Sequence, residues 1–272
     1  MQDLYVEHIV KRLEKDKAHL RLKFRDSKQL VGTRFCYIDD LLPVDLANDI
    51  DSVFPDTDSM RLISNFRERK YTSKDFDQFD HRLKDITFAF QDSAVIELIE
   101  YITEIKGQIS DNSSYAGGLS SMPSGSFLNP HIDNSHDANR QYYRTLNLLY
   151  YITPDWSEGY GGNLELWDNS VKQNTTIFSQ FNRLVIMETT PTSWHSVSGV
   201  TVERNRNCIS NYYFSPLSPV SKLYFNATLF SARPEQKFRR VLAKTDNLLR
   251  SSVRKLVPSG VGKKDVYEGD SK

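Results

Sequence analysis

Residues 127–133 read FLNPHID, and this stretch decides how the middle of the chain is interpreted. Side chains two residues apart in a strand point to the same side, so His131 and Asp133 can present an imidazole and a carboxylate to one metal ion. The alternative is a strand histidine that is hydrogen-bonded to a neighbouring carboxylate. A metal site at this position needs a third ligand from another strand.

His195 fits the role of third ligand because it lies in a run, residues 194–197, that can form a later strand. Two histidines and one carboxylate on one side of a metal leave the opposite positions open. This arrangement is typical of non-haem Fe(II) oxygenases. The sequence therefore predicts a metal site made of His131, Asp133 and His195, which are also the predicted catalytic residues.

The region around these residues consists of short β-rich runs with glycines and an asparagine between them. The runs lie near Leu119 and at 127–132, 145–152, 164–167, 176–178, 184–187 and 208–214. Strands at this spacing predict a sandwich or barrel of antiparallel strands. We expect an α+β, mainly β chain whose core is a double-stranded β-helix, a jelly-roll of the cupin type.

Helical patterns flank the predicted roll. Residues 4–24 suggest an amphipathic helix followed by a short extended piece, residues 34–38 a strand, and 41–53 and 93–106 two further helices. We divide the chain into a support region (1–112), a catalytic core (113–218), and a C-terminal basic amphipathic helix with its tail (219–272).

A basic residue opens the last strand of the predicted core. Arginine is the side chain best shaped to hold a carboxylate through two parallel hydrogen bonds. Counting by twos from Arg206 places Ser210 on the same face, so both can reach one carboxylate. Arg204 has the same parity and stays open as the alternative.

At this point the chain resembles the prolyl 4-hydroxylase-like branch of the 2-oxoglutarate and Fe(II)-dependent oxygenases. The marks of the resemblance come in order between 127 and 214, and they are FLNPHID, YYITPDW at 150–156, GGNLELW at 161–167, NRLVIM at 182–187, His195, and an arginine followed by ISNYYF at 209–214.

The resemblance implies Fe(II), 2-oxoglutarate and O2, with ascorbate as a further candidate cofactor. It assigns the carboxylate of the co-substrate to Arg206 and a hydrogen bond to Tyr151, with Leu149 and Leu164 as pocket walls. It also implies hydroxylation of a C–H bond with release of succinate and CO2.

The substrate is less well specified. Residues 66–82 and 134–144 are expected to form loops at the mouth, and Arg144 is either a substrate ligand or part of a surface salt bridge. We favour a small molecule, a sugar or an amino-acid-type substrate. The alternatives are a prolyl 4-hydroxylase acting on a protein and a non-catalytic cupin-like protein that binds a metal or sugar.

The charge and composition of the chain limit which partners and which cellular location we expect. Lys plus Arg (35) balance Asp plus Glu (35), which argues against a nucleic-acid partner, and two cysteines do not make a disulfide framework. Without an apolar leader or span we expect a cytoplasmic protein. Residues 233–257 predict a basic helix that either contacts the inner face of the membrane peripherally or packs on the roll or at a dimer interface. The oligomeric state is not predicted.

Overall fold

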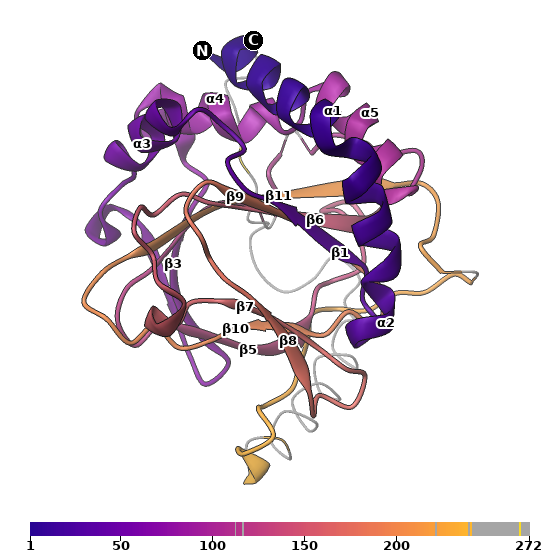
Figure 1. Ribbon diagram of the computed structural model, residues 1–272. Coiled ribbons are helices and arrows are strands. Elements are labelled where there is room, and N and C mark those ends of the chain that lie inside the picture. Colours follow the sequence, from indigo (N-terminus) through magenta and orange to yellow (C-terminus); the bar gives the residue numbers. More distant parts are fainter. Residues whose placement is uncertain (112, 116, 221, 239, 241–266, 268–272) are drawn as a thin grey trace.

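The computed structural model describes residues 1–111, 113–115, 117–220, 222–238, 240 and 267. Its helices lie together on one side of the molecule (Figure 1). They are α1 (Gln2–Asp26), α2 (Lys28–Val31), α3 (Val44–Ser52), α4 (His81–Ala89) and α5 (Ser93–Thr103), and the short 3-10 turns are η1 (Thr57–Ser59), η2 (Phe76–Gln78) and η3 (Glu158–Tyr160).

The strands pair antiparallel in one folded sheet. They are β1 (Phe35–Ile38), β2 (Arg61–Ser64), β3 (Glu68–Ser73), β4 (Gly118–Met122), β5 (Phe127–Ile132), β6 (Tyr143–Tyr151), β7 (Leu164–Trp167), β8 (Asn174–Ile177), β9 (Arg183–Glu188), β10 (His195–Val197), β11 (Arg206–Ser215) and β12 (Leu229–Phe230). Central strands such as β7 and β9 are buried on both faces, and turn residues separate the strands from one another.

The sheet folds into two layers. One layer has the order β1-β9-β6-β11-β4 and lies beneath the helices, and the other has the order β5-β10-β7-β8 (Figure 1). Strand β3 pairs with both β4 and β5 and so joins the layers. The jelly-roll with flanking N-terminal helices that the sequence predicts is confirmed.

The helix boundaries differ from the prediction for local reasons. The extended piece expected after the first helix is wrong, because α1 continues to Asp26 and buries Leu20 and Phe24 one turn apart. Helix α3 begins after Pro43, whose backbone is extended. Helix α5 ends at Thr103 because Glu104 adopts the left-handed conformation with φ 59°.

The expectation of a loop at 66–82 is also corrected. Residues 68–73 form β3, which pairs with β2 in a hairpin, and His81 begins α4. Asp80 caps this helix by accepting a hydrogen bond from the backbone N–H of Arg82 at 2.9 Å. The charged composition concealed a strand whose residues are all half-buried.

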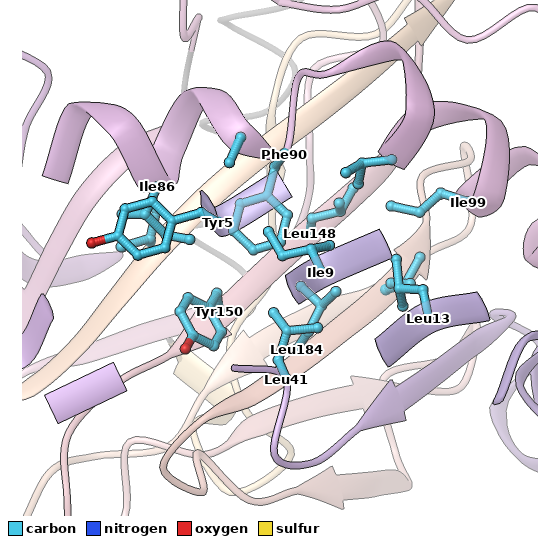
Figure 2. Close-up of a cluster of buried hydrophobic side chains, with 14 of the residues drawn as sticks. Tyr5, Ile9, Leu13, Leu41, Ile86, Phe90, Ile99, Leu148, Tyr150 and Leu184 are labelled. Atoms are coloured by element: carbon cyan, nitrogen blue, oxygen red, sulfur yellow. The ribbon is translucent and has the colours of Figure 1, made fainter. Parts of the chain in front are cut away.

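Alternation along the strands sends apolar side chains to two separate clusters. Leu148 and Tyr150 of β6 and Leu184 of β9 face the helices, where they pack with residues of α1 such as Ile9 (Figure 2). Tyr151, Val185 and Cys208 point the other way, into the interior of the roll. The period of two therefore divides each strand between a helix-packing face and a cavity face.

The C-terminal region continues the sheet beyond residue 218, because β12 pairs with β5. Most of the predicted basic helix at 233–257 lies outside the described residues, so its membrane contact stays a prediction, as does the cytoplasmic location. Among the described residues, no helix combines the length and the apolar character that crossing a membrane requires.

Candidate metal centre

The three predicted ligands meet at the centre of the roll. His131 on β5 and His195 on β10 are directly paired across the two strands, and Asp133 follows β5 immediately. One potential ligand atom from each lies within 4.8 Å of the others, and all three side chains are buried. The pairing of β5 with β10 therefore brings the third ligand, His195, to the His-x-Asp (HxD) pair formed by His131 and Asp133.

Backbone carbonyls fix the orientation of both imidazoles. Nδ1–H of His131 donates to the carbonyl of Asn129 at 3.0 Å, and Nδ1–H of His195 donates to the carbonyl of Ser193 at 3.0 Å. Each Nε2 is then left as the free acceptor that a metal needs. The His131 Nε2 lies 3.6 Å from Asp133 Oδ1, which is longer than a hydrogen bond, so the alternative of a simple histidine–carboxylate bond does not describe the site.

The electrostatics of the cluster also fit a cation. Burial, reinforced by His195, lowers the pKa of His131 to about 3, so its imidazole is neutral near pH 7. Burial alone would raise the pKa of Asp133, but His195 and Arg144 lower it overall. Within the described residues Asp133 Oδ2 is buried and accepts no hydrogen bond. A divalent metal such as Fe(II) would satisfy this oxygen.

One cavity brings the predicted co-substrate residues to the same place. Its lining contains all eight residues that the sequence analysis assigned to the site: His131, Asp133, His195, Arg206, Tyr151, Ser210, Leu149 and Leu164. On β11, Arg206 and Ser210 line the cavity as the counting by twos predicts, and on β6 the residues implied by the resemblance, Leu149 and Tyr151, also occupy alternate positions. The structure thus joins the metal ligands and the candidate carboxylate clamp in a single pocket.

The two candidate arginines have different environments. Arg206 is 5% exposed and lies 5.3 Å over the ring of Tyr151. Its Nη2 contacts the sulfur of Met122, while Nε has no hydrogen-bond partner among the described residues. Arg204 is exposed and donates to the backbone carbonyls of Pro154 and Asp155. Geometry therefore selects Arg206 as the residue that can receive a carboxylate in the cavity.

The Gly161–Gly162 pair lies close to Arg206 and to the backbone of Gly199. A Cβ on Gly161, where φ is +75°, would lie 1.9 Å from the carbonyl oxygen of Gly199. A Cβ on Gly162, where φ is +67°, would press on Val200 and on the aliphatic stem of Arg206. Glycine is required because it has no Cβ and adopts positive φ without strain. This part of the motif therefore fixes the position of the aliphatic stem of Arg206, which lines the cavity.

Arg144 is not on the surface, which corrects the salt-bridge alternative. It is 1% exposed, its Nη1 lies 3.7 Å from Asp133 Oδ2, and its guanidinium stacks 4.0 Å over the ring of Tyr212. Neither Nε nor Nη2 has a hydrogen-bond partner among the described residues. A buried guanidinium that lines the cavity with unused donors is suited to bind an acceptor group of a ligand.

Several further residues of the cavity wall are not identified individually in the sequence analysis, which places only the stretch 66–82 as a whole at the mouth. Lys70 and Thr72 come from β3, and Thr228 and Phe230 come from the C-terminal segment. The charged composition of β3 and the isolation of β12 from the other strands concealed them. Tyr212 shares the parity of Arg206 and Ser210, so counting by twos identifies it as a cavity residue.

The middle of the chain matches a known family. Residues 117–214 match the model described as the 2OG-Fe(II) oxygenase superfamily. An 88-residue segment is 32% identical to the prolyl 3-hydroxylase OGFOD1 of Mus musculus, which covers 30% of this chain and 16% of that protein. The chain thus corresponds to only a small part of this relative's length.

Solved structures with the same fold include two prolyl hydroxylases. A Pseudomonas putida prolyl-4-hydroxylase superposes with a TM-score of 0.52 at 15% identity, covering 72% of this chain and 98% of that one. A Trichoplax adhaerens prolyl hydroxylase, solved with a hypoxia inducible factor peptide fragment, gives 0.51 at 20% identity, covering 75% and 92%. At these identities the likeness concerns the fold.

Proposed function

We propose that this chain, which belongs through residues 117–214 to the 2OG-Fe(II) oxygenase superfamily, hydroxylates an aliphatic carbon of an amino-acid-type substrate. The resemblance seen in the sequence is confirmed by the family match. The observation that carries the proposal is the shared cavity of His131, Asp133, His195 and Arg206. It provides a place for a metal and a carboxylate clamp for a dicarboxylate beside it.

Each residue of the cavity has a defined task. His131, Asp133 and His195 would hold Fe(II) through two imidazole nitrogens and one carboxylate. Arg206 and Ser210 would receive the distal carboxylate of 2-oxoglutarate, and Tyr151 would donate a hydrogen bond to it. Leu149 and Leu164 line the same cavity and exclude water from the bound co-substrate.

Fe(II) with 2-oxoglutarate supplies O2 activation coupled to decarboxylation. The balance is one C–H bond, one O2 and one 2-oxoglutarate converted to one C–OH, one succinate and one CO2. The protein positions the substrate carbon and keeps bulk water away from the buried ligands. A pure binding scaffold has no comparable need for the buried Arg206 beside its metal ligands.

Arg144 supports the class of substrate. Its unused donors lie next to the metal ligands, so a substrate with an acceptor close to the target carbon would satisfy them. A carboxylate or carbonyl attached to an aliphatic carbon, as in an amino acid, has this chemistry. Sugars offer neutral hydroxyl groups instead, and these accept weaker hydrogen bonds from a guanidinium than a carboxylate does.

A prolyl residue within a peptide is the second candidate. It is favoured by the prolyl hydroxylases among the relatives and structural neighbours. The peptide carbonyl of such a residue could occupy the donors of Arg144 in the same way as a free carboxylate. The two candidates therefore differ in what surrounds the target residue.

The proposal is tested by measuring succinate formation with Fe(II), 2-oxoglutarate, ascorbate and O2. Free amino acids including L-proline, capped proline-containing peptides, and simple sugars are compared, with Asp133→Ala as the inactive control. We expect an amino acid or peptide to stimulate succinate formation and to gain one oxygen atom by mass. Absence of any 2-oxoglutarate turnover above the control would favour the non-catalytic binding protein.

A further inference from the structure

The segment 226–233 reaches the metal centre although it lies after the matched domain. Strand β12 pairs with the edge of β5, with Phe230 opposite His131 and Leu229 opposite Ile132. Strand β3 uses the earlier part of the same edge. The C-terminal segment thus lies against the strand that carries the first metal ligand.

Phe230 makes a face contact with that ligand. Its ring stacks on the imidazole of His131 with centroids 5.5 Å apart and an interplanar angle of 22°. The residue is 6% exposed and lines the cavity. The carbonyl of Asn129 fixes one nitrogen of the imidazole, but a single hydrogen bond still lets the ring tilt. The phenyl face restricts this tilt, so the direction of Nε2 depends on Phe230.

Hydrogen bonds fasten the segment on both sides of Phe230. Asn226 donates from Nδ2 to the backbone carbonyl of Asp133 at 2.8 Å, and its own carbonyl accepts from the backbone N–H of Ser135 at 3.0 Å. The backbone N–H of Ser231 donates to the carbonyl of Pro130 at 2.7 Å. The segment therefore forms hydrogen bonds with the backbone on both sides of His131 and Asp133.

A bidentate ion pair fixes the end of the segment. Arg233 donates from Nη1 and Nη2 to the two carboxylate oxygens of Glu165 at 3.0 and 2.5 Å. Glu165 is 7% exposed and also accepts from the hydroxyl of Ser196, the residue after His195, at 2.5 Å. The same carboxylate thus contacts the segment and the strand of the second histidine.

We infer that Phe230 and Arg233 are positioning residues of the metal centre. Phe230 sets the tilt of the His131 imidazole, and Arg233 holds Phe230 in place through Glu165. Neither residue belongs to the group of side chains that could ligate the metal. The inference rests on the metal site of the proposed function and extends it to residues outside the matched domain.

The test uses the full-length apo-protein titrated with Co(II), whose visible absorption reports ligand geometry and needs no turnover. Phe230→Leu keeps an apolar side chain but removes the ring. Phe225→Leu is the matched control, since Phe225 is 47% exposed and its ring lies tilted against His136 instead. We expect Phe230→Leu to weaken Co(II) binding by about tenfold and to shift the bands, as outer-shell changes do. Phe230→Tyr should restore both properties.

Arg233→Met should reproduce the weaker binding and the band shift, whereas Arg82→Met, which removes a bidentate ion pair with Asp80 outside the cavity lining, should not. Unchanged Co(II) affinity and spectrum in Phe230→Leu would overturn the inference, as would equal losses of Co(II) affinity in Phe230→Tyr and Phe230→Leu. Neither result would affect the proposed function. If the wild type fails to bind Co(II), the metal site of the proposed function falls as well.

Discussion

The two faces of the layer β1-β9-β6-β11-β4 differ in chemistry although they belong to the same strands. On the helix side, Leu148 and Tyr150 pack in an apolar cluster with α1. On the cavity side, Leu149 and Tyr151 lie beside Arg206 and the metal ligands. Neighbouring residues of β6 therefore have different roles, because one packs in the apolar cluster and the next lines the cavity. Substitutions on the two faces should have different consequences.

The largest effect is expected at the metal ligands of the cavity. Asp133→Ala removes the only carboxylate of the cluster, so Fe(II) binding and turnover should be lost. The exposed Asp58→Ala is the matched control and should behave as wild type. Iron content after anaerobic loading measures the first quantity and succinate formation the second. Iron bound normally by Asp133→Ala would remove this residue from the ligand set.

The next effect concerns the carboxylate clamp. Arg206→Met should raise the concentration of 2-oxoglutarate needed for half-maximal turnover by about 10- to 100-fold, the value of a charge-assisted hydrogen bond. Fe(II) affinity should change little. Arg204→Met, on the surface, is the control and should leave both values unchanged. If Arg204→Met has the larger effect, the assignment of the clamp is reversed.

A smaller effect is expected from Arg144. Replacement by Met removes a buried guanidinium whose Nε and Nη2 have no hydrogen-bond partner within the described chain. Bound Fe(II) would balance the charge of Asp133, which lies 3.7 Å from the Arg144 Nη1, so the metal-loaded protein should stay folded. The KM for the substrate should rise by about tenfold while substrate-independent 2-oxoglutarate turnover persists. Arg140→Met, in the neighbouring loop, is the control. An unchanged KM in Arg144→Met would remove this residue from the substrate site.

The smallest effect on the site should come from the helix face. Leu148→Ala creates a cavity in the apolar cluster and should cost about 2–5 kcal/mol of unfolding free energy, measured by denaturant titration. Metal and 2-oxoglutarate affinities should stay at wild-type values below the transition. Leu149→Ala, one residue further, should instead weaken 2-oxoglutarate binding. Equal behaviour of the two variants would contradict the separation of the faces.

The sequence predicted the roll well because its strands are short β-rich runs that turn residues separate. Residues 127–132 and 164–167 match the observed strands β5 and β7 at both ends. Alternation also placed Ser210 on the face of β11 that lines the cavity with Arg206, since facing parity is a local property, whereas Tyr151 was identified through the family resemblance. The HxD pattern predicted a partner strand, and pairing of β5 with β10 supplies it.

What the sequence could not predict depends on contacts between distant segments. Strand β3 reads as a charged loop because its residues are half-buried and two of its charged side chains, Glu68 and Lys70, line the cavity. Strand β12 has two residues, too few for a periodicity. Phe230 is therefore recognisable only through its pairing with His131. Truncation of the chain at residue 219 would remove Phe230 together with the basic C-terminal region. Such a truncation therefore cannot show what the basic region does by itself.

The central claim is that His131, Asp133, His195 and Arg206 together hold Fe(II) and 2-oxoglutarate in one cavity. The most direct measurement is anaerobic titration of the apo-protein with Fe(II) and then 2-oxoglutarate, monitored by the weak visible charge-transfer band of the chelate. The account predicts that the band appears with wild type, disappears in His195→Ala, and needs more 2-oxoglutarate in Arg206→Met. No band in the wild-type protein, or an undiminished band in His195→Ala, would contradict it.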